Sequence, residues 1–226
     1  MTAQTADIPR RDIIIPSLKA DIKGDLTVPD NPKGVIIFAH GIGSDRKSPR
    51  NRYVAEMLFH AGFAGLLIDL YSEQEAAMGQ LSQKMRGDFI PMMAGRLNAA
   101  TEWALRDDRT AHLPIGYYGA SAGAAAALAA ALQRPQIIGA IVCRGGRPDL
   151  VGRILPDVQP PTLLIVGEQD SSTVHLNRHA MEKLKTEKQL VIVPGASHLF
   201  EEPGALEEVG TLTKSWFQEH LLADMT

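Results

Sequence analysis

Residues 115–124 read Ile-Gly-Tyr-Tyr-Gly-Ala-Ser-Ala-Gly-Ala. A short run suited to a buried strand leads into the turn sequence, and an alanine-rich helix pattern leaves it. Glycines two positions either side of a serine, between a strand and a helix, predict a sharp turn that exposes the serine hydroxyl. The turn forces Ser121 into a strained backbone conformation, in which side chains at Gly119 and Gly123 would collide with their neighbours. Ser121 is therefore a candidate nucleophile.

Two later strand patterns end in an acidic residue and in a histidine. The apolar run 161–166 precedes Asp170, and the apolar run 190–193 precedes His198. Continuous apolar runs are typical of strands buried on both faces of a parallel sheet, and active groups gather at the carboxyl ends of such strands. The chain order serine, acid, histidine is the one that accompanies this serine turn, and it differs from the orders of two common protease folds. We expect Ser121, Asp170 and His198 to form a catalytic triad.

Each member of this triad would have its own role. His198 would accept the proton of Ser121 Oγ as the hydroxyl attacks an acyl carbonyl, and water activated by His198 would later release the acyl group. Asp170 would orient the imidazole and stabilise its protonated form. We favour Asp170 because it lies deepest in the loop that follows its strand. The competing acids are Glu168, Asp149 and Asp157.

The loop after an earlier strand pattern, residues 34–39, is a candidate for the other part of such a site. It begins His40-Gly41-Ile42-Gly43. A loop at this place supplies one backbone N–H of an oxyanion hole, and the residue after the nucleophile supplies the other. We assign these donors to Ile42 and Ala122, and each such donor is worth roughly 3–4 kcal/mol of transition-state stabilisation. We expect His40 to hold the loop in place rather than to act in catalysis.

The composition limits the classes of protein to consider. A chain of 226 residues with 45% hydrophobic content suits a single α/β domain over residues 1–226. The net charge of −3 gives no support for nucleic-acid binding. No stretch approaches the roughly 18 apolar residues that a membrane span needs, and residues 1–11 lack the apolar segment of a signal peptide. The single cysteine, Cys143, cannot form an internal disulfide and is expected in the core, which fits a cytoplasmic protein.

Apolar strand patterns alternate with helix patterns along the chain. This alternation predicts an α/β fold with a mostly parallel sheet of about eight strands and helices on both faces. The first two strands are expected to pair as an antiparallel opening. The expected strands cover 13–15, 21–28, 34–39, 63–70, 114–118 and 137–142, and two more end near Asp170 and His198. The expected helices cover 50–61, 81–106, 122–133, 175–185 and 203–222.

These features resemble the α/β-hydrolase family and, within it, the dienelactone hydrolase-like group. The resemblance covers nearly the whole chain and rests on four motifs that each follow a strand pattern: His40-Gly41-Ile42-Gly43, Gly119-Ala120-Ser121-Ala122-Gly123, Gly167-Glu168-Gln169-Asp170 and Gly195-Ala196-Ser197-His198. It implies an eight-stranded, mostly parallel sheet. The hydrolases that name the group carry a cysteine nucleophile, whereas this chain carries Ser121. That departure favours ordinary serine-esterase chemistry over lactone-specific chemistry.

Two basic segments, 46–52 and 144–147, belong to the same edge of the sheet as the triad. We expect Arg144 or Arg50 to bind a carboxylate or phosphate group of the substrate. The alternative is that both segments are ordinary solvated loops, whose charges bind no substrate group. The segment 143–160 is too short for a large cap domain, so we expect an open site that accepts small or short acyl groups. The expected partner is a small-molecule ester, with no cofactor, metal, nucleic acid or membrane. The sequence does not set the oligomeric state.

Three classes of function stay open. The favoured one is a serine carboxylesterase or related hydrolase. The second is an acyltransferase or thioesterase that uses the same covalent intermediate, and product analysis with alcohol or thiol acceptors would distinguish it. The third is a non-catalytic binding protein on a hydrolase scaffold, which a Ser121→Ala variant with full biological effect would favour.

Overall fold

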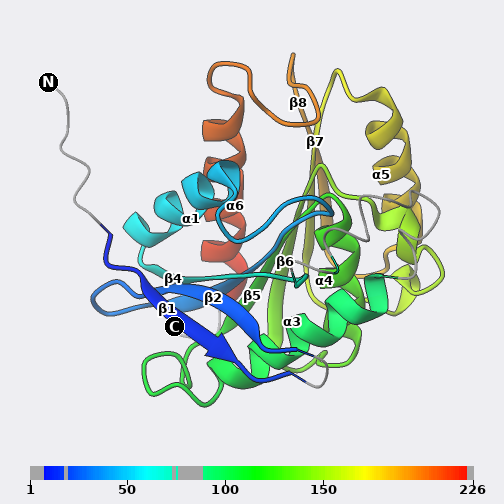
Figure 1. The fold of residues 1–226 in the computed structure, drawn as a ribbon. Helices are drawn as coiled ribbons and strands as arrows, with labels where there is room; N and C mark the ends of the chain where they lie inside the picture. Colours follow the sequence, from blue (N-terminus) through cyan, green and yellow to red (C-terminus); the bar gives the residue numbers. More distant parts are fainter. Residues whose placement is uncertain (1–7, 18–19, 73–74, 76–88, 223–226) are drawn as a thin grey trace, which may run out of the picture.

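An eight-stranded sheet forms the centre of the molecule (Figure 1). The computed structural model describes residues 8–17, 20–72, 75 and 89–222. The strands lie in the order β1-β2-β4-β3-β5-β6-β7-β8, and of these eight only β2 runs opposite to the others. Their bounds are β1 (Arg11–Ile15), β2 (Ile22–Thr27), β3 (Gly34–Ala39), β4 (Phe63–Ile68), β5 (Ile115–Ala120), β6 (Ile138–Arg144), β7 (Thr162–Gly167) and β8 (Lys188–Val193). The predicted fold class and the antiparallel opening pair are confirmed.

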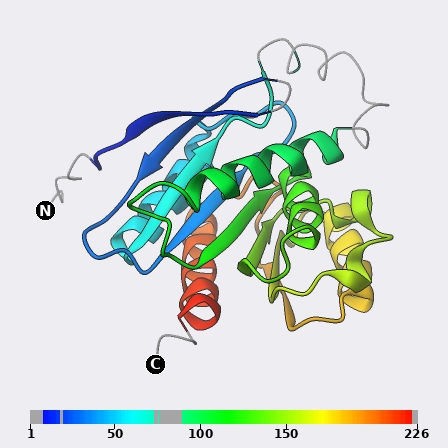
Figure 2. The same cartoon turned by 90° about the horizontal axis from the view of Figure 1, so that it is seen from below.

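Helices cover both faces of this sheet (Figure 2). Helices α1 (Pro49–His60) and α6 (Ala205–Leu221) pack on one face. Helices α3 (Ile90–Ala104), α4 (Ala122–Leu132) and α5 (Ser171–Lys183) pack on the other. The molecule is therefore a three-layer α/β structure, with a separate hydrophobic core on each side of the sheet.

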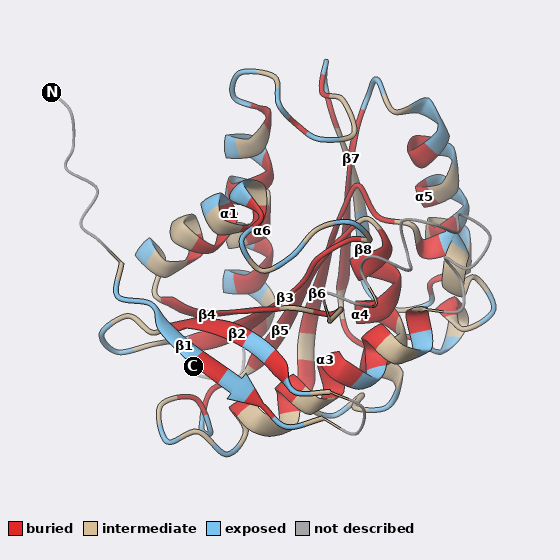
Figure 3. Cartoon of the chain, viewed as in Figure 1, coloured by how far each residue is buried: buried red, intermediate tan, exposed pale blue. Residues whose placement is uncertain are grey.

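Strand β3 shows why the strand patterns are continuously apolar. Val35 and Ile37 face the core beneath α3 and α4, whereas Ile36 and Phe38 face the core beneath α1 and α6. Successive side chains of a strand point to opposite faces, so a strand covered on both sides needs apolar residues at every position. Figure 3 shows the central strands as the most deeply buried part of the chain.

The helix starts depend on local capping. Ser48 caps α1, because its hydroxyl accepts a hydrogen bond from the Asn51 N–H, and Pro49 follows at the first helical position. Helix α5 begins at Ser171, four residues before the predicted start at 175, because the Asp170 side chain accepts the Thr173 N–H and caps the helix. The prediction of this start was wrong.

The remaining differences lie at element ends. The predicted helix 81–106 corresponds to α3, with Pro91 in its first turn, and residues 81–88 lie outside the described residues. Between β6 and β7 the chain forms only two short 3-10 helices, η2 (Pro148–Val151) and η3 (Leu155–Asp157), as expected for a site without a large cap. Every helix in the described part of the chain is too short or too polar to cross a lipid bilayer.

Candidate active site

Ser121 lies at the tight turn between β5 and α4, with φ 52° and ψ −121°. The glycines on either side allow this turn. A Cβ atom at Gly119 would lie 2.5 Å from Ala124 Cα, and one at Gly123 would lie 2.1 Å from the Ala39 carbonyl oxygen. Strand and helix therefore approach so closely that only glycine fits at both positions, and the serine is held in a left-handed conformation that ordinary residues avoid.

His198 and Asp170 form a hydrogen-bonded pair, with His198 Nδ1 2.6 Å from Asp170 Oδ2. The other carboxylate oxygen accepts hydrogen bonds from the Thr173 N–H and the Ser172 hydroxyl. Burial raises the pKa of Asp170, but the hydrogen bonds from Thr173, His198 and Ser172 outweigh it and hold the pKa below its ordinary value. Asp170 is therefore ionised at neutral pH and can orient the imidazole.

The three competing acids lie elsewhere. Glu168 accepts a hydrogen bond from the Gly195 N–H at 2.8 Å, and Asp149 pairs with Arg147 at 2.7 Å. Asp157 ends the short 3-10 helix η3. Among the described residues, Asp170 is the only one of the four acids that hydrogen-bonds to His198.

The loop after β6 contacts both Ser121 and His198. The Arg144 carbonyl accepts the Ser121 N–H, and the Arg147 N–H donates to the Ser121 carbonyl, both at 3.1 Å. Between them Gly145 has φ 52°, and a Cβ atom there would lie 3.4 Å from His198 Cε1. In the described part of the chain the Ser121 hydroxyl is not hydrogen-bonded to the imidazole. Catalytic hydrogen bonds commonly tighten only when substrate binds.

The predicted oxyanion loop, residues 40–48 between β3 and α1 and called the oxyanion loop below, packs against Ser121. A Cβ atom at Gly41 would lie 3.0 Å from Ser121 Cβ. Within the described residues, neither the Ile42 N–H nor the Ala122 N–H donates to a protein acceptor. Ala122 is the first residue of α4, where a helix leaves N–H groups free and carries positive partial charge. Both donors assigned from the sequence are thus free to bind an anionic oxygen.

His40 holds the oxyanion loop. Its Nδ1 donates to the Gly41 carbonyl, and its Nε2 accepts the Leu70 N–H, both at 2.8 Å. These partners require a neutral imidazole with its proton on Nδ1. Burial lowers the pKa of His40, and the weaker opposing effects of the Gly41 carbonyl, Asp69 and Asp45 do not reverse it. The ring is a structural link between the oxyanion loop and the end of β4.

The two predicted substrate-binding arginines occupy different places. Arg50 lines a cleft of about 750 Å³ that also includes Gly43 and Ser44 of the oxyanion loop. Its Nη1 is 3.0 Å from Glu201 Oε1. The cleft therefore lies along the Gly43–Ser44 part of the loop, and the described lining includes neither the two assigned N–H donors nor the predicted triad.

Arg144 is buried, with 7% of its surface exposed. Its Nη2 donates to Asn51 Oδ1 at 3.4 Å, its guanidinium lies 5.8 Å from the centre of the Phe200 ring, and its Nε has no hydrogen-bond partner among the described residues. A buried guanidinium N–H without a hydrogen-bond partner costs free energy. The unpaired Nε of Arg144 therefore favours the binding of an additional acceptor.

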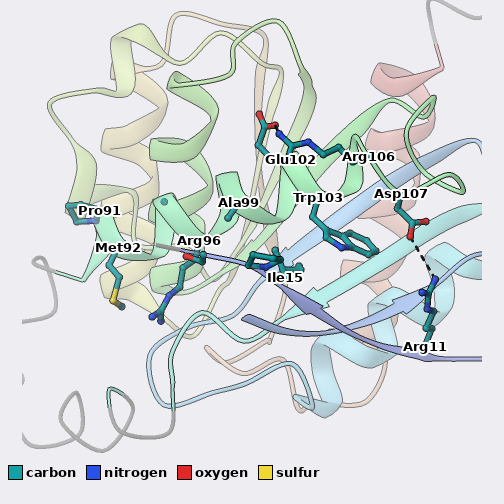
Figure 4. Close-up of a pocket in the computed structure, with 13 residues that line it drawn as sticks. Arg11, Ile15, Pro91, Met92, Arg96, Ala99, Glu102, Trp103, Arg106 and Asp107 are labelled. Atoms are coloured by element: carbon teal, nitrogen blue, oxygen red, sulfur yellow. Dashed lines mark hydrogen bonds and ion pairs between the residues drawn. The ribbon is translucent and has the colours of Figure 1, made fainter. Parts of the chain in front are cut away.

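A groove of about 1360 Å³ lies between β1 and α3 rather than at the predicted site (Figure 4). Ile15 and Trp103 form part of its apolar surface, and the Arg11–Asp107 ion pair lies at one end. Pro16 and Ser17 follow the carboxyl end of β1, but none of the described lining residues belongs to the predicted triad or to the loop 40–48. The lining residues are Arg11, Ile15, Pro16, Ser17, Pro91, Met92, Gly95, Arg96, Ala99, Glu102, Trp103, Arg106 and Asp107.

Two supporting residues were missed by the sequence reasoning. Gly145 gives the loop after β6 its left-handed turn beneath His198, and the consecutive glycines at 145 and 146 are a signal that could have identified it. Asn177 is fully buried on α5 and donates to the Gly146 carbonyl at 2.9 Å, which ties this loop to the helix. An asparagine within a helix pattern carries no sequence signal for that role.

Comparison with known proteins gives relatives along nearly the whole chain. Two proteins of Mycobacterium tuberculosis strains, provisionally named phosphoribosyl transferase, are 47% identical over 220 residues. The match covers 96% of this chain but 48% of theirs, so the chain spans about half the length of these curated relatives.

Solved structures and a family model agree on the fold. A crystal structure of dienelactone hydrolase from Anabaena variabilis has a TM-score of 0.89 at 48% identity, covering 94% of this chain and 98% of that one. A serine hydrolase without a lid from Xanthomonas campestris has a TM-score of 0.73 at 18% identity, covering 93% and 94%, and is a likeness of fold. The model of the dienelactone hydrolase family matches residues 22–221. The chain therefore belongs to the dienelactone hydrolase family and has the α/β-hydrolase fold.

Proposed function

We propose that this protein is a serine hydrolase that cleaves small or short-chain carboxylic esters through Ser121, His198 and Asp170. One arrangement carries the proposal. Ser121 lies in a strained turn beside two backbone N–H groups that have no protein acceptor among the described residues. The loop after β6 contacts both Ser121 and His198, and His198 is bound to the ionised Asp170. Such a set supplies a nucleophile, a base, an orienting acid and an oxyanion hole. The family membership supports a hydrolase.

The proposed reaction has two steps. Ser121 Oγ attacks the ester carbonyl while its proton passes to His198 Nε2, and the resulting oxyanion accepts hydrogen bonds from the Ile42 and Ala122 N–H groups. The ester C–O bond then breaks, and the alcohol leaves with the proton from His198. Water attacks the acyl-enzyme, His198 takes and returns a proton in the same way, and the carboxylic acid leaves with Ser121 restored.

Two features support an open site of modest selectivity that accepts small or short acyl groups. The segment between β6 and β7 contributes only the short helices η2 and η3. The cleft beside the oxyanion loop is lined mainly by polar and charged side chains, among them Lys23, Lys47 and Arg50. A long alkyl chain would gain little free energy by moving from water into such a polar cleft. A strong preference for long-chain lipid esters would contradict this part of the proposal.

Covalent labelling and ester hydrolysis test the function. A fluorophosphonate probe followed by peptide mapping should label Ser121, and p-nitrophenyl esters of graded length should be cleaved fastest at short length. Ser121→Ala should lose on the order of a million-fold in turnover. Ser215→Ala, at an exposed serine on α6, is the matched control and should keep wild-type activity. Labelling at another residue, or turnover that survives Ser121→Ala, would overturn the assignment. Adding alcohols or thiols to the same assay would detect acyl transfer.

The basic residues beside the site suggest an anionic group on the substrate. We propose that Arg50, which lines the cleft, and Arg144, which has a spare donor, bind that group. Esters with a free carboxylate or phosphate should then be preferred over neutral esters. Arg50→Ala and Arg144→Ala should each raise KM for anionic esters by about 10-fold or more, with little change for neutral ones. Arg153→Ala, at an exposed position, is the control. Unchanged preferences in both variants would remove the idea.

We place no phosphoribosyl transfer in this chain. The mycobacterial relatives are about twice as long as the part that this chain matches, and nearly all of this chain also matches the dienelactone hydrolase family. Incubation with 5-phosphoribosyl 1-diphosphate and purine or pyrimidine bases should release no pyrophosphate. Release that depends on the protein would contradict this assignment.

A further inference from the structure

The oxyanion loop is attached to the sheet through Arg46. The Arg46 N–H donates to Asp69 Oδ1 at 2.8 Å, its Nη1 donates to Asp69 Oδ2 at 2.5 Å, and its Nε donates to Asp25 Oδ1 at 2.8 Å. Asp25 lies within β2, and Asp69 directly follows β4. One side chain and its own main-chain N–H therefore join the loop to two neighbouring strands.

The second attachment of this loop reaches the same place. His40 Nε2 accepts the N–H of Leu70, the residue after Asp69. The Asp69 N–H in turn donates to the Lys23 carbonyl of β2 at 2.9 Å, so residues 69 and 70 are themselves fixed to the sheet. Ile42, the assigned oxyanion donor, lies between the two attachment points at His40 and Arg46. Its position depends on both.

We propose that Arg46 is a positioning residue for the oxyanion hole. This role rests on the proposed function. The Arg46–Asp25–Asp69 cluster fixes the backbone of residues 41–44, so that the Ile42 N–H is already aimed at the substrate carbonyl when its oxygen becomes negative. Donors that are fixed in advance stabilise that charge without having to reorganise during the reaction.

The surroundings of the cluster suit this role. The side chains of Arg46, Asp25 and Asp69 are only 16%, 7% and 16% exposed, so these contacts are unlike the weak ion pairs of open surfaces. The planar guanidinium fixes direction as well as charge, since it contacts one carboxylate through Nε and the other through Nη1. A lysine ammonium in the same place would keep the charge but could not reproduce this geometry.

Kinetics and a transition-state analogue test the proposal. Arg46→Ala should lower kcat for p-nitrophenyl acetate by about 10- to 100-fold, the range expected for a small displacement of a catalytic group. KM should change by less than about 3-fold, since the ester ground state carries no oxyanion. The inhibition constant of an aryl trifluoromethyl ketone, whose adduct with Ser121 carries an oxyanion, should rise in parallel with the loss in kcat/KM. Arg46→Lys should fall between Arg46→Ala and wild type.

Arg52→Ala is the matched control. Arg52 also bonds to Asp25, at 2.9 Å, but it belongs to α1 and makes no bond to residues 40–46 in the described part of the chain. This variant should lose stability and keep wild-type kcat and inhibition constant. If Arg46→Ala fails to fold, Asp69→Asn removes the charge from the same contact with nearly the same shape, and its kcat should fall in the same way.

The two proposals fail differently. If the wild-type protein hydrolyses no ester, the proposed function is wrong. If wild type is active and a folded Arg46→Ala or Asp69→Asn keeps wild-type kcat and inhibition constant, the function stands and the positioning role is wrong. Equal losses of kcat in Arg52→Ala and Arg46→Ala would also overturn the role, because the effect would then follow stability rather than the loop.

Discussion

Asp170 Oδ2 lies 2.6 Å from His198 Nδ1, while Oδ1 of the same carboxylate accepts the Thr173 N–H in the first turn of α5. One oxygen therefore starts a helix and the other faces the imidazole. Because the helix fixes the first oxygen, the direction of the second is fixed as well. The fold itself therefore orients the Asp170 carboxylate.

Asp170→Asn should separate these two tasks. Asparagine is as good a helix cap as aspartate, so the melting temperature should change little. Its side chain carries no charge and cannot hold the imidazole in the required tautomer, so kcat should fall by about 10⁴-fold, as in a well-studied serine protease. Asp157→Asn should leave kcat unchanged. A loss below about 10-fold in Asp170→Asn would contradict the role of this carboxylate.

Gly123→Ala should be strongly destabilising. The added methyl group would lie 2.1 Å from the Ala39 carbonyl oxygen, so α4 must move away from β3. We expect a loss of about 3 kcal/mol in the free energy of unfolding, the upper end for an overpacked interior. Urea denaturation followed by circular dichroism would measure it.

Gly95→Ala is the control for that measurement. Gly95 lies within α3, is exposed, and has open space where a Cβ atom would be. Alanine restricts the unfolded chain more than glycine does, so this variant should gain about 0.5–1 kcal/mol. Equal effects at both positions would contradict the steric explanation.

The Cys143 thiol should be unreactive in the folded protein. Cys143 is fully buried at the end of β6, next to the strand that leads to Ser121, and burial raises its pKa to about 12. The thiolate is the reactive form, so a disulfide reagent at about pH 8 should react only after the protein is unfolded. Rapid reaction of the native protein, followed by mass spectrometry, would show that this thiol is accessible.

Stability should decrease in acid partly through Asp25. Burial raises the pKa of Asp25, but hydrogen bonds and charge from Arg46 and Arg52 outweigh it and hold the pKa below the ordinary value of 3.8. A lowered pKa in the folded state adds stability above pH 3.8, and this stability is lost as pH falls through the folded value. Urea midpoints measured between about pH 2 and 7 should show this loss, and Asp25→Asn should make the profile flatter. An unchanged profile would contradict the assignment.

Elements that depend on a local pattern could be predicted from the sequence. The apolar runs predicted the strands of the sheet, because strands such as β3 face a hydrophobic core on each side and need apolar residues at every position. The glycines around Ser121 gave the turn, since they reflect a backbone requirement within a few residues. The start of α5 could not be predicted, because an aspartate after a strand suits both a loop and a helix cap. The Arg46 cluster could not either, since the contact of Asp25 with the loop depends on how β2 pairs with β4.

The two helical layers have a consequence for how activity is lost. Ser121 and Asp170 begin α4 and α5 on one side of the sheet, whereas the oxyanion loop leads into α1 and the His198 loop leads toward α6 on the other. Within the described residues, no single layer holds all of the groups that we propose to react. Slight slippage of either helical layer over the strands would separate His198 from Asp170, or Ile42 from Ser121, while every helix stays intact. Mild denaturant should therefore inactivate the protein before its helical content changes.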